Sequence, residues 1–291
     1  MFTKEEIQQI VYHGIPVEKA EKQIEFFTTG FPSLTLLRPA KTGDGITRFS
    51  EHQAEHFAAQ FDANASRMNM MKFVPASGAA TRMFKHLFAF HEALKMKSFR
   101  DIMNDDTYTD ALTFFQHIDD FAFWPLLKDV LQKHSIPSHL PLSHEHYSDV
   151  LNLLLFADGL NFSEMPKALI PFHQYDISYR YAFEEHLVEG VTYAKGLDNK
   201  VEVHFTLPSG VEELIRKKRE PLQNSLAEKH NAKIMVSCSV QHSATDTIAV
   251  TLNNKPFYDK NNRLCFRPGG HGALIHNLNQ QNADIVFIKN I

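Results

Sequence analysis

Cysteine is scarce in this chain of 291 residues, which contains only Cys238 and Cys265. Two cysteines cannot form a disulfide framework or a thiolate metal site, so disulfide-rich and zinc-finger classes are excluded. Both lie in apolar, strand-like runs, and we interpret them as small core residues. Tryptophan occurs once, against 24 phenylalanines, which indicates an aromatic core and says nothing about function.

An excess of positive charge is also missing. The 30 Lys and Arg residues face 34 Asp and Glu residues, a formal net charge of −4, which gives no sign of a nucleic-acid-binding surface. No apolar run is long enough to cross a bilayer, and the N-terminus has the pattern of an amphipathic helix, not of a signal peptide. We therefore expect a cytoplasmic protein without membrane or nucleic-acid partners; the composition does not indicate its oligomeric state.

The segment Phe73–Lys85, F-V-P-A-S-G-A-A-T-R-M-F-K, predicts a strand, a tight loop of small residues and a helix. Small side chains let the backbone approach a ligand closely, and the first amides of a helix attract anions. Arg82 adds a planar guanidinium group that suits phosphate oxygens. The alternative is an ordinary strand-to-helix turn with a surface arginine.

Periodicity gives the order of the other elements. It predicts helices within residues 1–30, 50–65, 177–194 and 211–230, and strands at 70–74, 201–207, 233–240 and 284–288. Residues 245–266 predict a hairpin. The last strand, D-I-V-F-I, has the apolar character of a buried central strand. Such a strand normally leads into another element, so we expect the chain to be a fragment or to lack its C-terminal part.

Strands that alternate with helices predict an α/β fold with a three-layer sheet. We expect residues 1–69 to form an N-terminal helical cap and residues 70–291 the α/β domain, with a large helical insertion at about 86–155. The phenylalanine stripe of this insertion is interpreted as core, because such stripes usually are. An exposed phenylalanine face would instead favour a scaffold protein that binds a partner there.

Three separated motifs resemble those of a known family. They are S-G-A-A-T-R-M (Ser77–Met83), P-K-A-L-I-P-F (Pro166–Phe172) and R-P-G-G-H-G (Arg267–Gly272). In this order they resemble the sugar-nucleotide pyrophosphorylases, particularly the UDP-sugar group, which has G-G-x-G-T-R-[LM], a P-K before an apolar strand, and P-x-G-[HN]-G. The resemblance covers about residues 70–291 and is strongest to an uncharacterised domain family of nucleotidyltransferase-like proteins. It implies a Rossmann-like, nucleotide-diphospho-sugar-transferase-like fold with a mixed sheet.

The resemblance implies a nucleotidyltransferase that joins a nucleoside triphosphate, with UTP favoured, to a sugar 1-phosphate and releases pyrophosphate. Arg82 would hold the β- and γ-phosphates, and Lys167 would contact the α-phosphate or the sugar phosphate. Mg²⁺ would bridge the phosphates. The nucleotide-binding residues would be Ser77, Gly78, Ala79, Ala80, Thr81, Gln241, Gly269, Gly270, His271 and Gly272.

The chain departs from that family in two ways. Ser77 and Ala80 replace two glycines of the first motif, and the family's metal-binding aspartate, in N-x-D-N after the last strand, is missing beyond Asn290 and Ile291. The protein's metal ligands are therefore unknown. A catalytically inactive nucleotide or sugar-nucleotide binding protein on the same fold is the main alternative. A glycosyltransferase on a related fold would need an acidic metal motif that the sequence does not offer.

Three other features have simpler interpretations. His144 and His146 have the spacing nearest to a zinc site, but nothing supplies the remaining ligands. The basic run Arg216–Arg219 is interpreted as a solvated helix face, with a phosphate-facing role as the alternative. Lys167 could equally be a lysine with a buried stem and a solvent-exposed tip.

Overall fold

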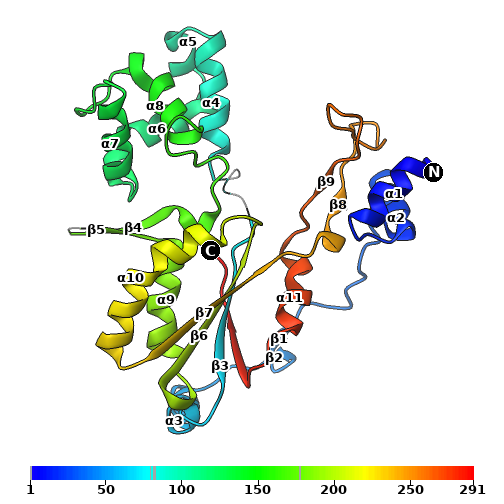
Figure 1. Ribbon diagram of the computed structural model, residues 1–291, viewed down its shortest axis with the longest axis vertical. Helices are drawn as coiled ribbons and strands as arrows, with labels where there is room; N and C mark the ends of the chain where they lie inside the picture. The colour runs from blue at the N-terminus through cyan, green and yellow to red at the C-terminus, as the bar shows by residue number, and fades with distance from the viewer. Residues whose placement is uncertain (1, 79, 81–82, 177) are drawn as a thin grey trace.

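A computed structural model gives the fold, and it describes residues 2–78, 80, 83–176 and 178–291, except for the side chain of His271. A four-stranded parallel sheet lies at the centre of the molecule (Figure 1). In order across the sheet, the strands are β10 (Ile285–Ile288), β3 (Met70–Pro75), β6 (Lys200–Leu207) and β7 (Lys233–Val240). The carboxyl ends of parallel strands meet at one edge, here called the carboxyl edge, and this is where open α/β sheets bind ligands.

Two long helices cover one face of this sheet. They are α9 (Ala182–Tyr193) and α10 (Glu212–His230). Their apolar side chains form one buried cluster with alternate residues of β3 and β6, among them Val74, Val203 and Phe205. The alternation follows from the two-residue period of a strand, and it confirms the strands predicted at 201–207 and 233–240.

The opposite face carries polar residues and a short helix. Phe73 of β3 stacks on His204 of β6, with ring centroids 5.4 Å apart, and α11 (Ile275–Asn279) lies against the end of β7. The chain is thus a mixed α/β protein with a parallel sheet. The prediction of a mixed sheet is wrong for these four strands, because the antiparallel pairs form separate ribbons. These are β4–β5 (Pro171–Tyr175 and Ser178–Tyr181) and β8–β9 (Thr247–Ile248 and Phe266–Arg267).

Both outer strands differ from the sequence expectation. Among the described strands, β10 pairs with β3 alone, and most of its side chains are half-buried, so the prediction of a buried central strand is wrong. β7 forms the other edge, and for that reason Cys238 is exposed; Cys265 is half-buried, so neither cysteine is a core residue. The helix predicted from residue 177 begins only at Ala182, because Ser178–Tyr181 pairs with β4.

Side chains from the helices bind the backbone carbonyls of the β7 edge. Arg219 Nη1 donates to Val236 O at 3.0 Å, and Gln223 Nε2 donates to Ile234 O at 2.9 Å. Asn277 Nδ2 of α11 donates to Val240 O at 3.0 Å. The basic run Arg216–Arg219 therefore faces two ways, since Arg216 pairs with Glu213 and Glu220 on the exposed face of α10.

Residues 85–155 form a separate helical bundle, here called the helical arm (Figure 1). It contains α4 (Lys85–Met96), α5 (Phe99–Met103), α6 (Thr109–Gln116), α7 (Trp124–Lys133) and α8 (Tyr147–Leu155). Phe90, Phe114, Phe115 and Phe123 are buried in its core, so the core interpretation of the phenylalanine stripe is confirmed for them. Their burial counts against the scaffold hypothesis.

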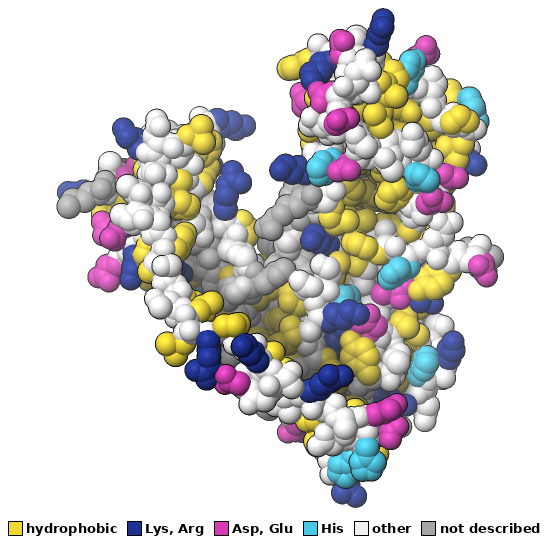
Figure 2. Space-filling view, turned by 180° about the vertical axis from the view of Figure 1, so that it is seen from behind, with side chains coloured by type: hydrophobic (Ala, Val, Ile, Leu, Met, Phe, Trp, Pro, Cys, Tyr) yellow, Lys and Arg dark blue, Asp and Glu magenta, His cyan; other side chains and the backbone are white. Residues whose placement is uncertain are grey.

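The N-terminal helices pack against the hairpin. Helices α1 (Lys4–Tyr12) and α2 (Val17–Thr29) share a small core with residues Ile248 and Leu264, and we call this unit the hairpin arm. Helix α1 begins with a capping box formed by Thr3 and Glu6. The chain then passes through β1 (Lys41–Thr42) and β2 (Gly45–Ile46) to α3 (Glu51–Ala65), where Phe61 meets Phe287 of β10. Figure 2 shows the molecule hollowed between the hairpin arm and the helical arm.

Candidate functional site

The loop after β3 is held at the carboxyl edge by its neighbour. Ala76 N donates to both the carbonyl and the hydroxyl oxygen of Thr206, at 3.0 and 3.1 Å. Ser77 Oγ then donates to Gln241 Oε1 at 3.1 Å. A Cβ added to Gly78 would meet no atom of the described residues within 4 Å, so these residues leave space beside this part of the loop.

Gln241, the residue after β7, joins two of the predicted motifs. Its Nε2 donates to Gly269 O at 3.1 Å, while its Oε1 accepts from Ser77. Gly269 must remain a glycine, because a Cβ there would lie 2.7 Å from Thr245 O. One amide therefore holds the loop after β3 and the R-P-G-G-H-G loop together.

The R-P-G-G-H-G loop leads into η8 (His271–Leu274) and then α11. Asn277 is 5% exposed and anchors this helix, because Nδ2 donates to Ser239 Oγ at 2.8 Å as well as to Val240 O. Added Cβ atoms on Gly270 and Gly272 would meet none of the described atoms within 4 Å. The structure thus brings Ser77, Gln241 and Gly269 together and leaves open space beside Gly78, Gly270 and Gly272.

Some predicted site residues lie outside the described residues. Ala79, Thr81 and Arg82 belong to this group, and so does the side chain of His271. Ala80 is described, and its side chain is fully buried in the core of the helical arm. The exposed fraction of the whole residue is 0%, so the backbone of Ala80 is buried as well.

Lys167 is half-buried at the start of η5 (Lys167–Leu169), just before β4. The next residues, Ala168 and Leu169, belong to the same buried cluster as Val74 and Ala76 at the end of β3. This packing brings the P-K-A-L-I-P-F motif to the base of the loop after β3. No described residue forms a hydrogen bond or an ion pair with the Lys167 ammonium group.

A buried charge cluster below this loop was missed by the sequence analysis. Lys72 of β3 is fully buried and binds Glu189 of α9. Lys289, directly after β10, donates to the other carboxylate oxygen of Glu189 at 2.5 Å, and Tyr193 OH donates to Glu189 at 3.0 Å. The signal was a lysine inside an otherwise apolar strand. Two ammonium groups against one carboxylate leave one net positive charge beside the middle of β3 and the carboxyl end of β10.

The cluster shifts the pKa values of its members. Burial opposes ionisation of Glu189, but hydrogen bonds from Lys289 and Lys72 outweigh it and hold the pKa of this carboxyl at about 2. Burial, together with the charge of Lys72, lowers the pKa of the neighbouring His186 to about 4. Burial also lowers the pKa of Lys72, which Glu189 opposes. At neutral pH we therefore expect a charged Glu189 and a neutral His186.

A second polar cluster lies on the opposite face of the sheet. The two ring nitrogens of His204 are each 2.8 Å from a serine hydroxyl, Ser237 Oγ and Ser239 Oγ, and burial lowers the pKa of this histidine. A neutral imidazole has one donor and one acceptor nitrogen, so one serine accepts from the ring and the other donates to it. Ser239 also accepts a hydrogen bond from Asn277, so this cluster holds α11 and the loop before it in place.

The described side chains do not form a set of ligands that would hold a metal ion. Within residues 2–78, 80, 83–176 and 178–291, no three His, Cys, Asp or Glu side chains are grouped to bind a metal, which gives no support to the zinc alternative. Glu189, the carboxylate beside β3 and β10, is already bound by two ammonium groups. No described helix has the length and apolar character needed to cross a bilayer.

Comparison with known proteins identifies a family for this chain. No curated protein and no solved structure matches the chain. A family model described as "Domain of unknown function (DUF4301)" matches residues 3–291, which is nearly the whole sequence. The chain therefore belongs to the DUF4301 family.

Proposed function

We propose that this protein is a nucleotidyltransferase that joins a nucleoside triphosphate, with UTP favoured, to a sugar 1-phosphate and releases pyrophosphate. The observation that carries the proposal is the double contact of Gln241 with Ser77 and Gly269. These bonds unite two separated motifs at the carboxyl edge of a parallel sheet, where ligands of such sheets bind. The resemblance to UDP-sugar pyrophosphorylases supplies the reaction.

Charge and space at this edge support an anionic substrate. Lys289 is about half exposed beside β3, and the cluster beneath it carries one net positive charge. The open space at Gly78, Gly270 and Gly272 allows phosphate oxygens to approach backbone amides. Phosphoryl transfer depends mainly on positioning and on compensation of negative charge, which amides and ammonium groups provide.

In the proposed reaction, an oxygen of the sugar 1-phosphate attacks the α-phosphorus of the triphosphate, and the bond to pyrophosphate breaks. Lys167 would neutralise charge on the α-phosphate or the sugar phosphate, and Arg82 would hold the leaving pyrophosphate. Mg²⁺ would enter bound to the triphosphate, with its remaining positions filled by water, since no protein carboxylates are grouped for it among the described residues.

The test is a thermal-shift panel with ATP, CTP, GTP and UTP, with and without Mg²⁺, followed by a pyrophosphate-release assay with several sugar 1-phosphates. A triphosphate at a hundred times its dissociation constant stabilises the native state by roughly 2.7 kcal/mol. Arg82→Ala and Lys167→Gln should remove the shift or the release. Lys128→Gln, on the exposed face of α7, is the matched control and should retain both. If no triphosphate stabilises the protein, the proposal is wrong.

The second candidate is a nucleotide-binding protein without turnover. It is favoured by one observation, namely that Glu189 is occupied by two ammonium groups and cannot serve as a free metal ligand. A thermal shift that Lys167→Gln abolishes, with no pyrophosphate release from any sugar 1-phosphate, would select this candidate. Release of pyrophosphate would exclude it.

A further inference from the structure

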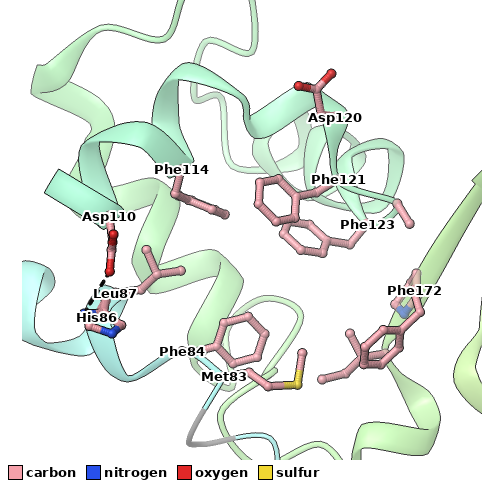
Figure 3. A pocket seen from close by; sticks show the side chains of 13 residues that line it. Met83, Phe84, His86, Leu87, Asp110, Phe114, Asp120, Phe121, Phe123 and Phe172 are labelled. Atoms are coloured by element: carbon pink, nitrogen blue, oxygen red, sulfur yellow. Dashed lines mark ion pairs between the residues drawn. The ribbon is translucent and has the colours of Figure 1, made fainter. Parts of the chain in front are cut away.

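An apolar cavity of about 420 Å³ lies beside the candidate site, between the helical arm and β4. Its walls come from the start of α4, from α6, from the segment around η3 (Ile118–Asp120) and from residues 170–172. Figure 3 shows aromatic rings from these elements around one space, with Phe84 and Met83 opposite Phe114, Phe121 and Phe123. The volume is within the range of small-molecule sites.

The cavity has a fixed interior and an accessible mouth. Phe84, Phe114 and Phe123 are buried and belong to the core of the helical arm. Phe121 and Phe172 lie on either side and are each 38% exposed. Buried side chains at packed positions keep their rotamers, so the apolar interior does not depend on a ligand for its shape.

Carboxylates are the only full charges on the described lining. Asp110 and Asp120 stand at the rim with exposed side chains, and no Lys or Arg occurs among the described residues that line the cavity. Asp110 lies 3.5 Å from His86 Nδ1, and Asp120 lies 3.1 Å from His117 Nδ1. The negative faces of the phenylalanine rings add to this potential, which attracts cations and repels anions.

We propose that this cavity binds a small organic amine whose apolar body enters among the phenylalanine rings and whose ammonium group stays at the rim near Asp110. An anion does not fit this lining, because its charge would face the Asp110 carboxylate, whereas the Asp120 carboxylate points away from the rings (Figure 3). A bare sugar does not fit either, since its hydroxyl groups require more hydrogen-bonding partners than one imidazole and two carboxylates provide. The cavity shares Met83 and residues 170–172 with two of the predicted motifs, but its occupancy does not require a nucleotide.

The test uses three probes with similar apolar bodies and different charges. They are 2-phenylethylamine as the cation, 2-phenylethanol as the neutral probe and 3-phenylpropionate as the anion, each titrated by protein-observed NMR on the full chain at pH 7. We expect the amine to bind most tightly and the anion most weakly. A rim carboxylate in water changes affinity by roughly two- to fivefold, so a ranking of this size is resolvable.

Two variants distinguish the contribution of the Asp110 charge to affinity from that of the apolar wall. Asp110→Asn should bring the amine and alcohol affinities within about twofold of each other, while Asp129→Asn, an exposed position on α7 outside the cavity, should leave the ranking unchanged. Phe172→Ala should weaken the amine and the alcohol alike, because it removes a wall at the mouth. Phe257→Ala, at a similarly exposed position of the hairpin arm, is its control.

The possible results are all decisive. Binding of the amine above the alcohol, with the difference lost in Asp110→Asn, supports the inference. Equal binding of all three probes, a preference for the anion, or binding that Phe172→Ala leaves intact would overturn it, and so would the absence of any bound probe. Because no nucleotide is present, these results are independent of the triphosphate panel.

Discussion

The ammonium group of Lys72 lies fully buried in β3 and pairs with Glu189 of α9, whose other carboxylate oxygen accepts from Lys289 at 2.5 Å. The pair is asymmetric. Glu189 has a second cationic partner and is partly exposed, whereas Lys72 has no second carboxylate among the residues in hydrogen-bond contact with it that the structure describes.

This asymmetry predicts unequal effects of removing either partner. Glu189→Gln leaves a buried ammonium group without its counter-charge and should lower the free energy of unfolding by about 3–5 kcal/mol. Lys72→Met should cost less, because Glu189 keeps Lys289 and Tyr193. In the double variant, which carries both substitutions, part of the lost unfolding free energy should be recovered. Urea unfolding of the four proteins measures the cycle, and Glu213→Gln on exposed α10 serves as the control. Equal losses in the two single variants would contradict the asymmetry.

Stability should fall in acid in two stages. The pKa of His186 is lowered from 6.5 to about 4, so its neutral form favours the native state, and this contribution is present above pH 6.5 and lost between about pH 6.5 and 4. Glu189, with its pKa lowered from 4.5 to about 2, contributes stability above pH 4.5 that is lost as the pH falls towards 2. In His186→Leu, the loss of unfolding free energy between pH 6.5 and 4 should be smaller than in the wild type by on the order of 2 kcal/mol. The loss at lower pH, which comes from Glu189, should remain.

Unfolding midpoints measured from pH 8 to 3 test these stages. Burial also lowers the pKa values of His91 and His204, so the variant should retain part of the upper stage. An unchanged slope between pH 6.5 and 4 in His186→Leu would show that this histidine is not neutral in the native state.

Gln241→Ala should loosen two loops at once. The variant loses the bonds to Ser77 and Gly269, and we expect a cost of about 1–2 kcal/mol in unfolding free energy. Hydrogen exchange should rise in residues 76–78 and 267–272 while the strands stay protected. Gln132→Ala, on exposed α7, should change neither region. Faster exchange confined to one loop would mean that the amide does not join them.

The hairpin arm should be a separate cooperative unit. Ile10 is fully buried between α1 and the hairpin, and Ile10→Ala should cost roughly 2–4 kcal/mol of local stability. Faster hydrogen exchange is then expected in α1, α2 and residues 247–266, with the parallel sheet unaffected. Ile7→Ala on the same helix, where the side chain is 37% exposed, is the matched control. A uniform loss of protection across the sheet would show that the arm and sheet unfold together.

Local patterns predicted most of the elements, because periodicity and caps act over a few residues. The capping box of Thr3 with Glu6 is such a signal, and helix α1 begins where it indicates. The sequence-based predictions were wrong where the burial of a residue depends on which strands lie beside it in the sheet. Four apolar residues in β10 do not reveal that β3 alone flanks them among the described strands. The exposure of Cys238 likewise follows from the edge position of β7.

The candidate site was predictable only in part. The small-residue motifs identified the loops at Ser77 and Gly269, and Gln241 was placed correctly after its strand. The bond between Ser77 and Gln241 spans 164 positions and depends on the strand order, which no local pattern contains. Lys72 was overlooked because its partner Glu189 lies 117 positions away.

The helix side chains on β7 have a consequence for association between molecules. An open sheet edge offers carbonyl groups to a strand from another chain, and this is a common start of aggregation. Arg219, Gln223 and Asn277 occupy three of these carbonyls from within the same molecule. Arg219, which belongs to the basic run on α10, thereby covers part of the edge, and undocking of α10 would free the carbonyls of Ile234 and Val236 for a strand of another chain.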